Sequence, residues 1–258
     1  MSKLDQAQIQ NALLCGQAVV FEEIDSTNEY LLKHYQGLPQ GSVCLAEQQT
    51  AGRGRRGRKW YSPQSENVYF SILWHYLTEQ AAYISSLSLV VALVIAESLQ
   101  AQQVENIQIK WPNDIYYCGK KMGGILIETK ADRNGVHLVI GIGLNLGMTK
   151  IDEQIVTQPW ADLSHYQFDR NGLVCRLAYQ LQKNLKIYPL VGFEHYVERW
   201  QSFDIFRHQA VKLVTEGSEI HGISRGINQN GELLLEQNGV ITPFGIGEMS
   251  LRAEEKQE

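Results

Sequence analysis

The sequence predicts an α+β protein in two parts, a larger mixed unit in residues 1–203 and a small β-rich unit in residues 204–258. Three observations support this division. Helical and strand patterns are interleaved through the first part. After about residue 203 only short β-rich runs follow one another. The length of 258 residues suits one large domain with a small appendage.

Within the first part, the clearest helix signal is Ser26, which is followed three residues later by Glu29. This is a capping-box pattern, so we expect a helix to begin there. Pro112 ends a strand, because proline cannot donate to a sheet ladder. Further helices are expected at 4–14, 81–103, 171–188 and 193–200, and strands at 43–47, 67–74, 107–111, 115–117, 122–129 and 136–142.

The second part is expected to be a small β-barrel of roughly 50 residues, a size at which a domain can just fold alone. Tight-turn signals at Asn230-Gly231 and Asn238-Gly239 separate its strands. The strands are expected at 211–215, 219–226, 232–236, 240–243 and 249–252.

Composition excludes several classes of protein. A net charge of -5 argues against broad attraction to nucleic acid or to anionic lipid. The four cysteines form no Cys-x-x-Cys pair, and the seven histidines show no ligand spacing, so no structural zinc is expected. The start is not a signal peptide, and the longest apolar run, 87–96, is too short to span a bilayer. We expect a cytoplasmic protein with no membrane partner.

The segment from Gly52 to Trp60 holds five basic residues and three glycines within nine positions. Arginine forks match phosphate or carboxylate oxygens, so the segment is a candidate anion-binding loop. It contains Gly-x-Gly-x-x-Gly, but a poor helix start follows, which excludes a Rossmann fingerprint. No P-loop spacing is present. A solvated basic loop and a nucleic-acid patch remain as alternatives.

Other motifs are individually weak. Asn113 and Asp114 follow Pro112 and suit a magnesium ion or a ribose, although an ordinary Asx-turn explains them equally. Lys121 precedes two glycines, which a hairpin turn with a solvated lysine also explains. The run 141–147 ends a buried strand with glycines and Asn145, as a tight turn would. Together these motifs supply what an enzyme needs to activate a carboxylate with a nucleotide.

In this order, Ser26-Thr27-Asn28, the loop 52–60, Lys110-Trp111-Pro112-Asn113-Asp114 and Lys121-Met122-Gly123-Gly124 closely resemble biotin–protein ligases. Residues 222–252 resemble the C-terminal barrel of that family. The resemblance implies a mixed sheet with flanking helices, similar to class II aminoacyl-tRNA synthetases, plus an SH3-like barrel. It implies a catalytic domain at 1–203 and an SH3-like domain at 204–258.

The resemblance also assigns roles. Arg55 and Lys121 are the expected catalytic residues, and Asp114 the expected magnesium ligand. The expected biotin-binding residues are Ser26, Thr27, Asn28, Gln49, Gly52, Arg53, Gly54, Arg55, Lys121 and Gly124. The expected ATP-binding residues are Arg55, Arg58, Trp60, Asn113, Asp114, Lys121, Asn145, Trp160 and Arg252.

The activity that the resemblance implies is ATP-dependent formation of biotinyl-5'-AMP, followed by transfer of biotin to a lysine of the biotin carboxyl carrier protein of acetyl-CoA carboxylase. Biotin, ATP, Mg²⁺ and the carrier are the expected partners. Some members carry an N-terminal DNA-binding module, and too few residues precede Ser26 to form one, so no specific DNA binding or repressor activity is expected. Lipoate–protein ligase is the nearest rival, and both a monomer and a homodimer remain open.

Overall fold

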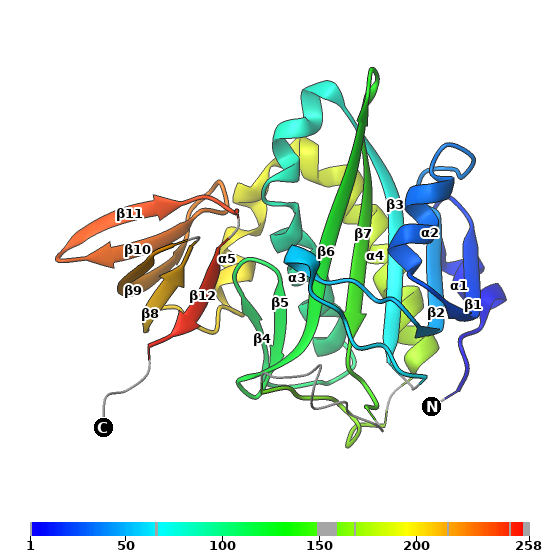
Figure 1. Ribbon diagram of the computed structural model, residues 1–258, viewed down its shortest axis with the longest axis horizontal. Helices are drawn as coiled ribbons and strands as arrows, with labels where there is room; N and C mark the ends of the chain where they lie inside the picture. Colours follow the sequence, from blue (N-terminus) through cyan, green and yellow to red (C-terminus); the bar gives the residue numbers. More distant parts are fainter. Residues whose placement is uncertain are drawn as a thin grey trace.

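A seven-stranded mixed sheet forms the larger part of the molecule (Figure 1). The computed structural model describes residues 2–64, 67–148, 159–167, 169–215, 217–247 and 249–254. The strand order is β1-β2-β3-β7-β6-β5-β4, with β1 parallel to β2 and every other pair antiparallel. The strands are β1 (Ala18–Ile24), β2 (Val43–Gln49), β3 (Val68–Leu77), β4 (Ile107–Lys110), β5 (Asp114–Tyr117), β6 (Lys120–Asp132) and β7 (Gly135–Leu144).

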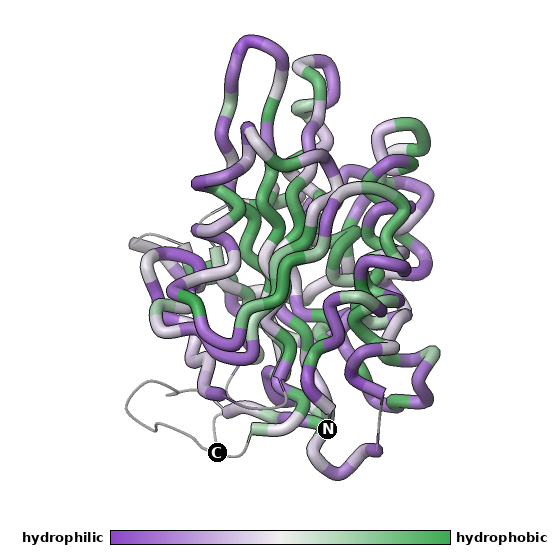
Figure 2. Tube along the Cα trace, turned by 90° about the vertical axis from the view of Figure 1, so that its right-hand side faces the viewer, coloured by the Kyte–Doolittle hydropathy of each residue, from purple (hydrophilic) through white to green (hydrophobic). Residues whose placement is uncertain are grey.

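Helices cover both faces of this sheet. They are α1 (Gln6–Ala12), α2 (Thr27–His34), α3 (Leu87–Gln100), α4 (Arg170–Val191) and α5 (Val197–Gln201), with short 3₁₀ turns η1 (Arg55–Gly57), η2 (Thr78–Ile84) and η3 (Phe193–Tyr196). Side chains along β7 point alternately to the two faces of the sheet, so neighbouring residues join different hydrophobic cores. Leu138 and Ile140 join the large core with α3 and α4, whereas Val139 joins the smaller cluster under α2. Figure 2 shows hydrophobic residues (green) gathered in the central strands and hydrophilic residues (purple) at the projecting loops.

A second, antiparallel sheet follows as the SH3-like C-terminal part. Its strands are β8 (Ala210–Val214), β9 (Glu219–Ile227), β10 (Leu233–Gln237), β11 (Val240–Phe244) and β12 (Ser250–Ala253), in the order β11-β10-β9-β8-β12. It lies beside the β4–β5 edge of the first sheet (Figure 1). The buried indole of Trp111 donates to the carbonyl of Gly231 at 3.1 Å, which fastens the two sheets together. The domain boundary between residues 203 and 204 stays a prediction.

One expectation about local structure was wrong, and one strand was missed. The helix expected at 81–103 is broken into η2 and α3, which are bent by 62° at the intervening serines. Strand β1 was not predicted, because its sequence carries two glutamates and its burial does not alternate cleanly. The expected cap at Ser26 is confirmed, since its side chain accepts from the Glu29 amide at 3.4 Å.

No single helix in the described part of the chain is long and apolar enough to cross a membrane. Only η2 and α3 taken together pass that test of length and composition. Twelve of the fourteen residues of α3 are buried in the protein core.

Candidate active site

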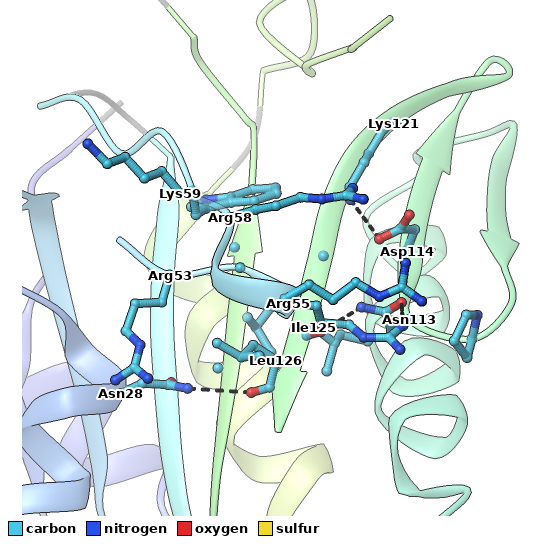
Figure 3. A pocket seen from close by; sticks show the side chains of 18 of the residues that line it. Asn28, Arg53, Arg55, Arg58, Lys59, Asn113, Asp114, Lys121, Ile125 and Leu126 are labelled. Atoms are coloured by element: carbon cyan, nitrogen blue, oxygen red, sulfur yellow. Dashed lines mark hydrogen bonds and ion pairs between the residues drawn. The ribbon is translucent and has the colours of Figure 1, made fainter. Parts of the chain in front are cut away.

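A cleft lies on the face of the seven-stranded sheet that α2 covers only in part (Figure 3). Its walls come from the start of α2, the end of β2, the loop 52–60, the turn after β4, strands β6 and β7, and the start of β12. The expected site residues that line it are Ser26, Thr27, Asn28, Gln49, Arg53, Gly54, Arg55, Arg58, Trp60, Asn113, Asp114, Lys121 and Gly124.

We call Ser26, Thr27, Asn28, Gln49 and Ser71 the floor of this cleft. The backbone amide and hydroxyl of Thr27 donate to Gln49 Oε1 at 2.9 and 3.1 Å. Gln49 Nε2 in turn donates to Ser62 Oγ at 2.9 Å. Thr27 is only 3% exposed, so these polar groups are fixed in position before any ligand arrives.

Asn28 extends this network across the sheet. It accepts from Ser71 Oγ at 2.5 Å and donates to Glu128 Oε2 at 2.8 Å. A Cβ atom on Gly141 would lie 2.3 Å from Asn28 Oδ1, so glycine is needed there for the close approach. Sequence analysis missed Ser71 and Glu128. The one available signal was a lone serine inside the apolar run of β3.

The loop 52–60, which we call the roof, is closed on itself by backbone hydrogen bonds. The amide of Gly54 donates to the Arg58 carbonyl at 2.7 Å, and that of Trp60 to the Gly52 carbonyl at 2.9 Å. Arg53 anchors the roof through ion pairs with Glu29 of α2 at 2.6 Å and Glu128 of β6 at 2.7 Å. Both carboxylates are next to the floor, since Glu29 follows Asn28 on α2 and Glu128 accepts from the Asn28 side chain.

Arg55 joins three distant segments. Its guanidinium donates to Asn113 Oδ1 at 2.7 Å and to the carbonyl of Gly247 at 2.6 Å. Gly247 belongs to the C-terminal part, which also places Met249 and Ser250 in the cleft wall. Sequence analysis expected only Arg252 from this part and missed these three residues, because their placement depends on how the second sheet docks.

Lys121 lies opposite, at the start of β6. Its ammonium group is 2.7 Å from Asp114 Oδ1 and 5.8 Å from the centre of the Trp60 ring. Lys110, a lining residue to which the sequence assigned no role, is 3.7 Å from Asp114 Oδ2. Burial lowers the pKa of Lys110, Asp114 opposes that effect, and the positive charge of Arg252 lowers it further.

The indole ring of Trp60 packs closely against strand β7 at Gly143, as Asn28 does at Gly141. A Cβ atom on Gly143 would lie 2.5 Å from the indole Nε1, so only glycine leaves room for this ring. Trp60 Nε1 is buried and has no hydrogen-bond partner among the described residues. Gly141 and Gly143 therefore belong to strand β7 and leave room for the side chains of Asn28 and Trp60 to lie against it.

Four expected site residues do not line the cleft. Gly52, the first residue of the roof, is buried, and a Cβ atom there would lie 2.5 Å from the Trp60 carbonyl. Trp160 forms a β-bridge with Lys121. The Asn145 side chain is buried, and its Oδ1 has no partner among the residues described. Arg252 is exposed on β12, close enough to act on the charge of Lys110.

Asp114 is the single carboxylate among the described lining residues. Protein-bound Mg²⁺ is usually held by one or two carboxylates together with substrate phosphates. Asp114 fits that pattern as one ligand, although both of its oxygens face lysine ammonium groups at 2.7 and 3.7 Å.

Comparison with known proteins identifies related families for both parts of the chain. Residues 20–145 match the Biotin/lipoate A/B protein ligase family, and residues 209–252 match the Biotin protein ligase C terminal domain. The bifunctional ligase/repressor BirA of Escherichia coli is 43% identical over 98% of this chain and 79% of its own length. The chain belongs to the biotin protein ligase family.

Two further biotin ligases are similar to this chain, one in sequence and one in structure. The biotin–[acetyl-CoA-carboxylase] ligase of Paracoccus denitrificans is 31% identical over 82% of this chain and 90% of its own length. The structure of the Aquifex aeolicus biotin protein ligase with biotin and ATP superposes with a TM-score of 0.80, at 30% identity, over 92% of this chain and 99% of that one. This protein is therefore a ligase of the biotin–protein class, with biotin and ATP as substrates.

Proposed function

We propose that this ligase forms biotinyl-5'-AMP in the cleft and then transfers the biotinyl group to one lysine of a biotin carboxyl carrier protein. The observation that carries the proposal is the convergence of Arg55 and Lys121 on one cleft through adjacent residues, Asn113 and Asp114. A basic residue on each side of a polar floor suits a small acid and a phosphate held together.

In the proposed binding mode, biotin lies on the floor. Its ureido group would meet Ser26, Thr27 and Gln49, and each buried polar group left without a partner would cost about 1–3 kcal/mol. The backbone of the roof around Gly52, Arg53 and Gly54, together with Gly124 and Asn28, would enclose the ring system. The apolar side chain of Leu126, which pairs with Gly141 on the cleft face of the sheet, suits the hydrocarbon part of the acid.

In the first step, a biotin carboxylate oxygen attacks the α-phosphorus of ATP, and the bond to the bridging oxygen of pyrophosphate breaks. Lys121 would neutralise charge on the carboxylate and the α-phosphate, and Arg55 would hold the phosphate. Mg²⁺ would enter with the triphosphate and neutralise its oxygens, with Asp114 as its protein ligand. Arg58, Trp60, Asn113, Asn145, Trp160 and Arg252 complete the proposed nucleotide site.

In the second step, the neutral amine of the carrier lysine attacks the acyl carbon, and AMP leaves. Asp114 is the base candidate that we retain for the amine proton. Lysine titrates near pH 10.4, so the transfer rate should rise with pH as more amine becomes neutral.

Two further expectations belong to the proposal. The net charge of -5 supports the absence of operator binding by this 258-residue chain. Operator binding at physiological salt would contradict it. We also infer a cytoplasmic location, supported by four cysteines that are all free.

The decisive assay incubates the protein with ATP, Mg²⁺, biotin and a carrier domain, and then measures the mass of the carrier. We expect one added biotinyl group, on one lysine, dependent on ATP. Lipoate in place of biotin is the matched control, because the family model includes lipoate ligases. A preference for lipoate in calorimetry or in carrier labelling would overturn the proposal.

A further inference from the structure

The far end of β6 and β7 carries a second group of polar side chains, at the hairpin that projects furthest in Figure 1. His75 on β3 lies directly opposite His137 on β7, and Asp132 ends β6. Lys121 lies at the other end of β6, so at about 3.3 Å per residue the group is roughly 35 Å from the catalytic lysine. We call these three residues the hairpin cluster.

One face of the sheet carries both sites. Along β7 this face presents Gly143 and Gly141 to the cleft, Val139 to the core under α2, and His137 to the hairpin cluster. Helix α2 thus separates the cleft from the cluster. The cluster is not part of the biotin or ATP site.

The two histidines form a cross-strand pair, whose Cβ atoms stand about 5 Å apart in an antiparallel sheet. Their ring centres are 4.5 Å apart, with the rings tilted by 43°. Nε2 of His75 is buried and has no hydrogen-bond partner among the described residues. A buried nitrogen left without a partner is unfavourable, and a bound ligand would satisfy it.

Asp132 directs one oxygen at the histidines and uses the other to shape the turn. Its Oδ1 accepts from the amides of Asn134 at 2.8 Å and Gly135 at 3.2 Å. Its Oδ2 is 3.0 Å from His137 Nε2. The turn therefore fixes the carboxylate where a third ligand would stand.

The surrounding groups hold His137 in place. The ring of Tyr35 packs against His137 with centres 4.7 Å apart. The ammonium group of Lys130 lies 5.0 Å from the centre of the Tyr35 ring and donates to the Leu32 carbonyl at 2.8 Å. The Lys130 ammonium group therefore interacts with Tyr35 and with the Leu32 carbonyl of α2.

We propose that His75, Asp132 and His137 form a binding site for a divalent transition metal ion of the zinc class, with the fourth position open to water. One ligand atom from each residue lies within 4.8 Å of the ligand atoms of the other two. Small rotations of these partly exposed side chains bring them to bonding distance, about 2.0–2.2 Å for imidazole nitrogen and carboxylate oxygen on zinc. Two imidazoles and one carboxylate favour Zn²⁺ and its neighbours over Mg²⁺ or Ca²⁺, which prefer oxygen ligands.

The test uses the full chain without an affinity tag, stripped of metal with a chelator. Zn²⁺ binding is measured by calorimetry, and Co²⁺ is added as a spectroscopic substitute whose visible absorption reports a four-coordinate site. The variants are His75→Gln, His137→Gln and Asp132→Asn. The matched control is His221→Gln, an exposed histidine beside Glu219 and Glu254 in the second sheet.

We expect one Zn²⁺ per chain and a Co²⁺ spectrum that Zn²⁺ abolishes. Loss of either cluster histidine should weaken binding at least about 100-fold, since even loss of an outer partner costs 10–100-fold. The His221→Gln control should bind as the parent protein does. Circular dichroism shows whether each variant is folded. Absence of stoichiometric binding, or unchanged binding in a folded His75→Gln variant, would overturn the proposal.

Discussion

The floor and the roof of the cleft are built in different ways. The floor residues come from α2 and two buried strands, and Ser71 is 0% exposed while Asn28 is 4% exposed. In the roof, by contrast, the Arg53 side chain is 45% exposed, and charged contacts to Glu29, Glu128, Asn113 and Gly247 hold the loop. From this contrast we propose that the floor sets which acid binds, whereas the roof controls how long the activated acid stays.

Lys121→Ala removes the ammonium group that we propose neutralises charge on the carboxylate and the α-phosphate. Of the proposed variants, this one should lower activity most. Without the ammonium group, biotin-dependent ATP–pyrophosphate exchange should fall about 10²–10³-fold in kcat, the usual cost of one group that stabilises developing charge. Biotin affinity should change far less, because the floor is intact. Lys120→Ala, an exposed neighbour, is the control. Unaltered exchange in the Lys121 variant would remove this lysine from the mechanism.

Arg55→Gly tests the roof. Hydrogen bonds to a charged group contribute about 1.5–3 kcal/mol, so release of biotinyl-5'-AMP should speed up roughly 10–100-fold. Adenylate formation should remain measurable, and unrelated proteins present in the assay should become biotinylated on surface lysines. Arg55→Lys should leak less than Arg55→Gly, and the exposed Arg207→Ala should not leak. Equal retention of the intermediate in all variants would contradict a retaining role for the roof.

The roof is also expected to be mobile without ligand, because glycines and mutually repelling cations favour disorder. Biotin or the adenylate should order it and exclude water from the mixed anhydride. Limited proteolysis near Arg55 should therefore slow when biotin is added. Cleavage that is equally fast with and without biotin would count against this expectation.

Gly141→Ala tests whether the floor is fixed. The new Cβ atom would meet Asn28 Oδ1 at 2.3 Å, and crowding of this kind costs about 1–3 kcal/mol of unfolding free energy. Denaturant unfolding should show that loss, and KM for biotin should rise as Asn28 moves. Gly37→Ala, where the nearest atom lies 3.8 Å from the new Cβ, is the control. A stable variant with unchanged KM would show that the floor can adapt.

Asp204→Asn tests the segment between α5 and β8, where Asp204 forms a β-bridge with Ile109 of β4. Burial raises the pKa of Asp204 from 3.8 to about 6, while the Phe206 amide and Arg207 lower it. The folded chain therefore holds the proton more tightly than the unfolded chain, and stability is lost as pH rises from about 4 through 6. The asparagine variant should lack this loss and gain on the order of 1–3 kcal/mol at pH 7.

The measurement is unfolding free energy across pH 3.5 to 8 for the parent protein and the variant. The gain should vanish below about pH 4, where both states are protonated. Glu198→Gln, on the exposed side of α5, is the control. A difference between parent and variant that does not change with pH would contradict the assigned cause.

Local features were the ones that the sequence could predict. The cap at Ser26 and the strand end at Pro112 depend on near neighbours, and the small C-terminal β unit followed from its turn signals. The mixed sheet and the meeting of Arg55 and Lys121 in one cleft were expected only from the resemblance to biotin–protein ligases. Contacts that neither the local pattern nor the resemblance specified were missed. Ser71 and Glu128 join the site only because β3 and β6 flank β7, and the histidines of the hairpin cluster are 62 residues apart in sequence (75 to 137).

The measurement closest to the central claim is the amount of intermediate retained when no carrier is present. The protein is mixed with ATP, Mg²⁺ and biotin and passed through a desalting column, and the bound biotinyl-5'-AMP is quantified by mass spectrometry. The account predicts about one molecule per chain for the parent protein, little for Arg55→Gly because it escapes, and little for Lys121→Ala because it is not made. Equal amounts of bound intermediate in all three proteins would contradict it.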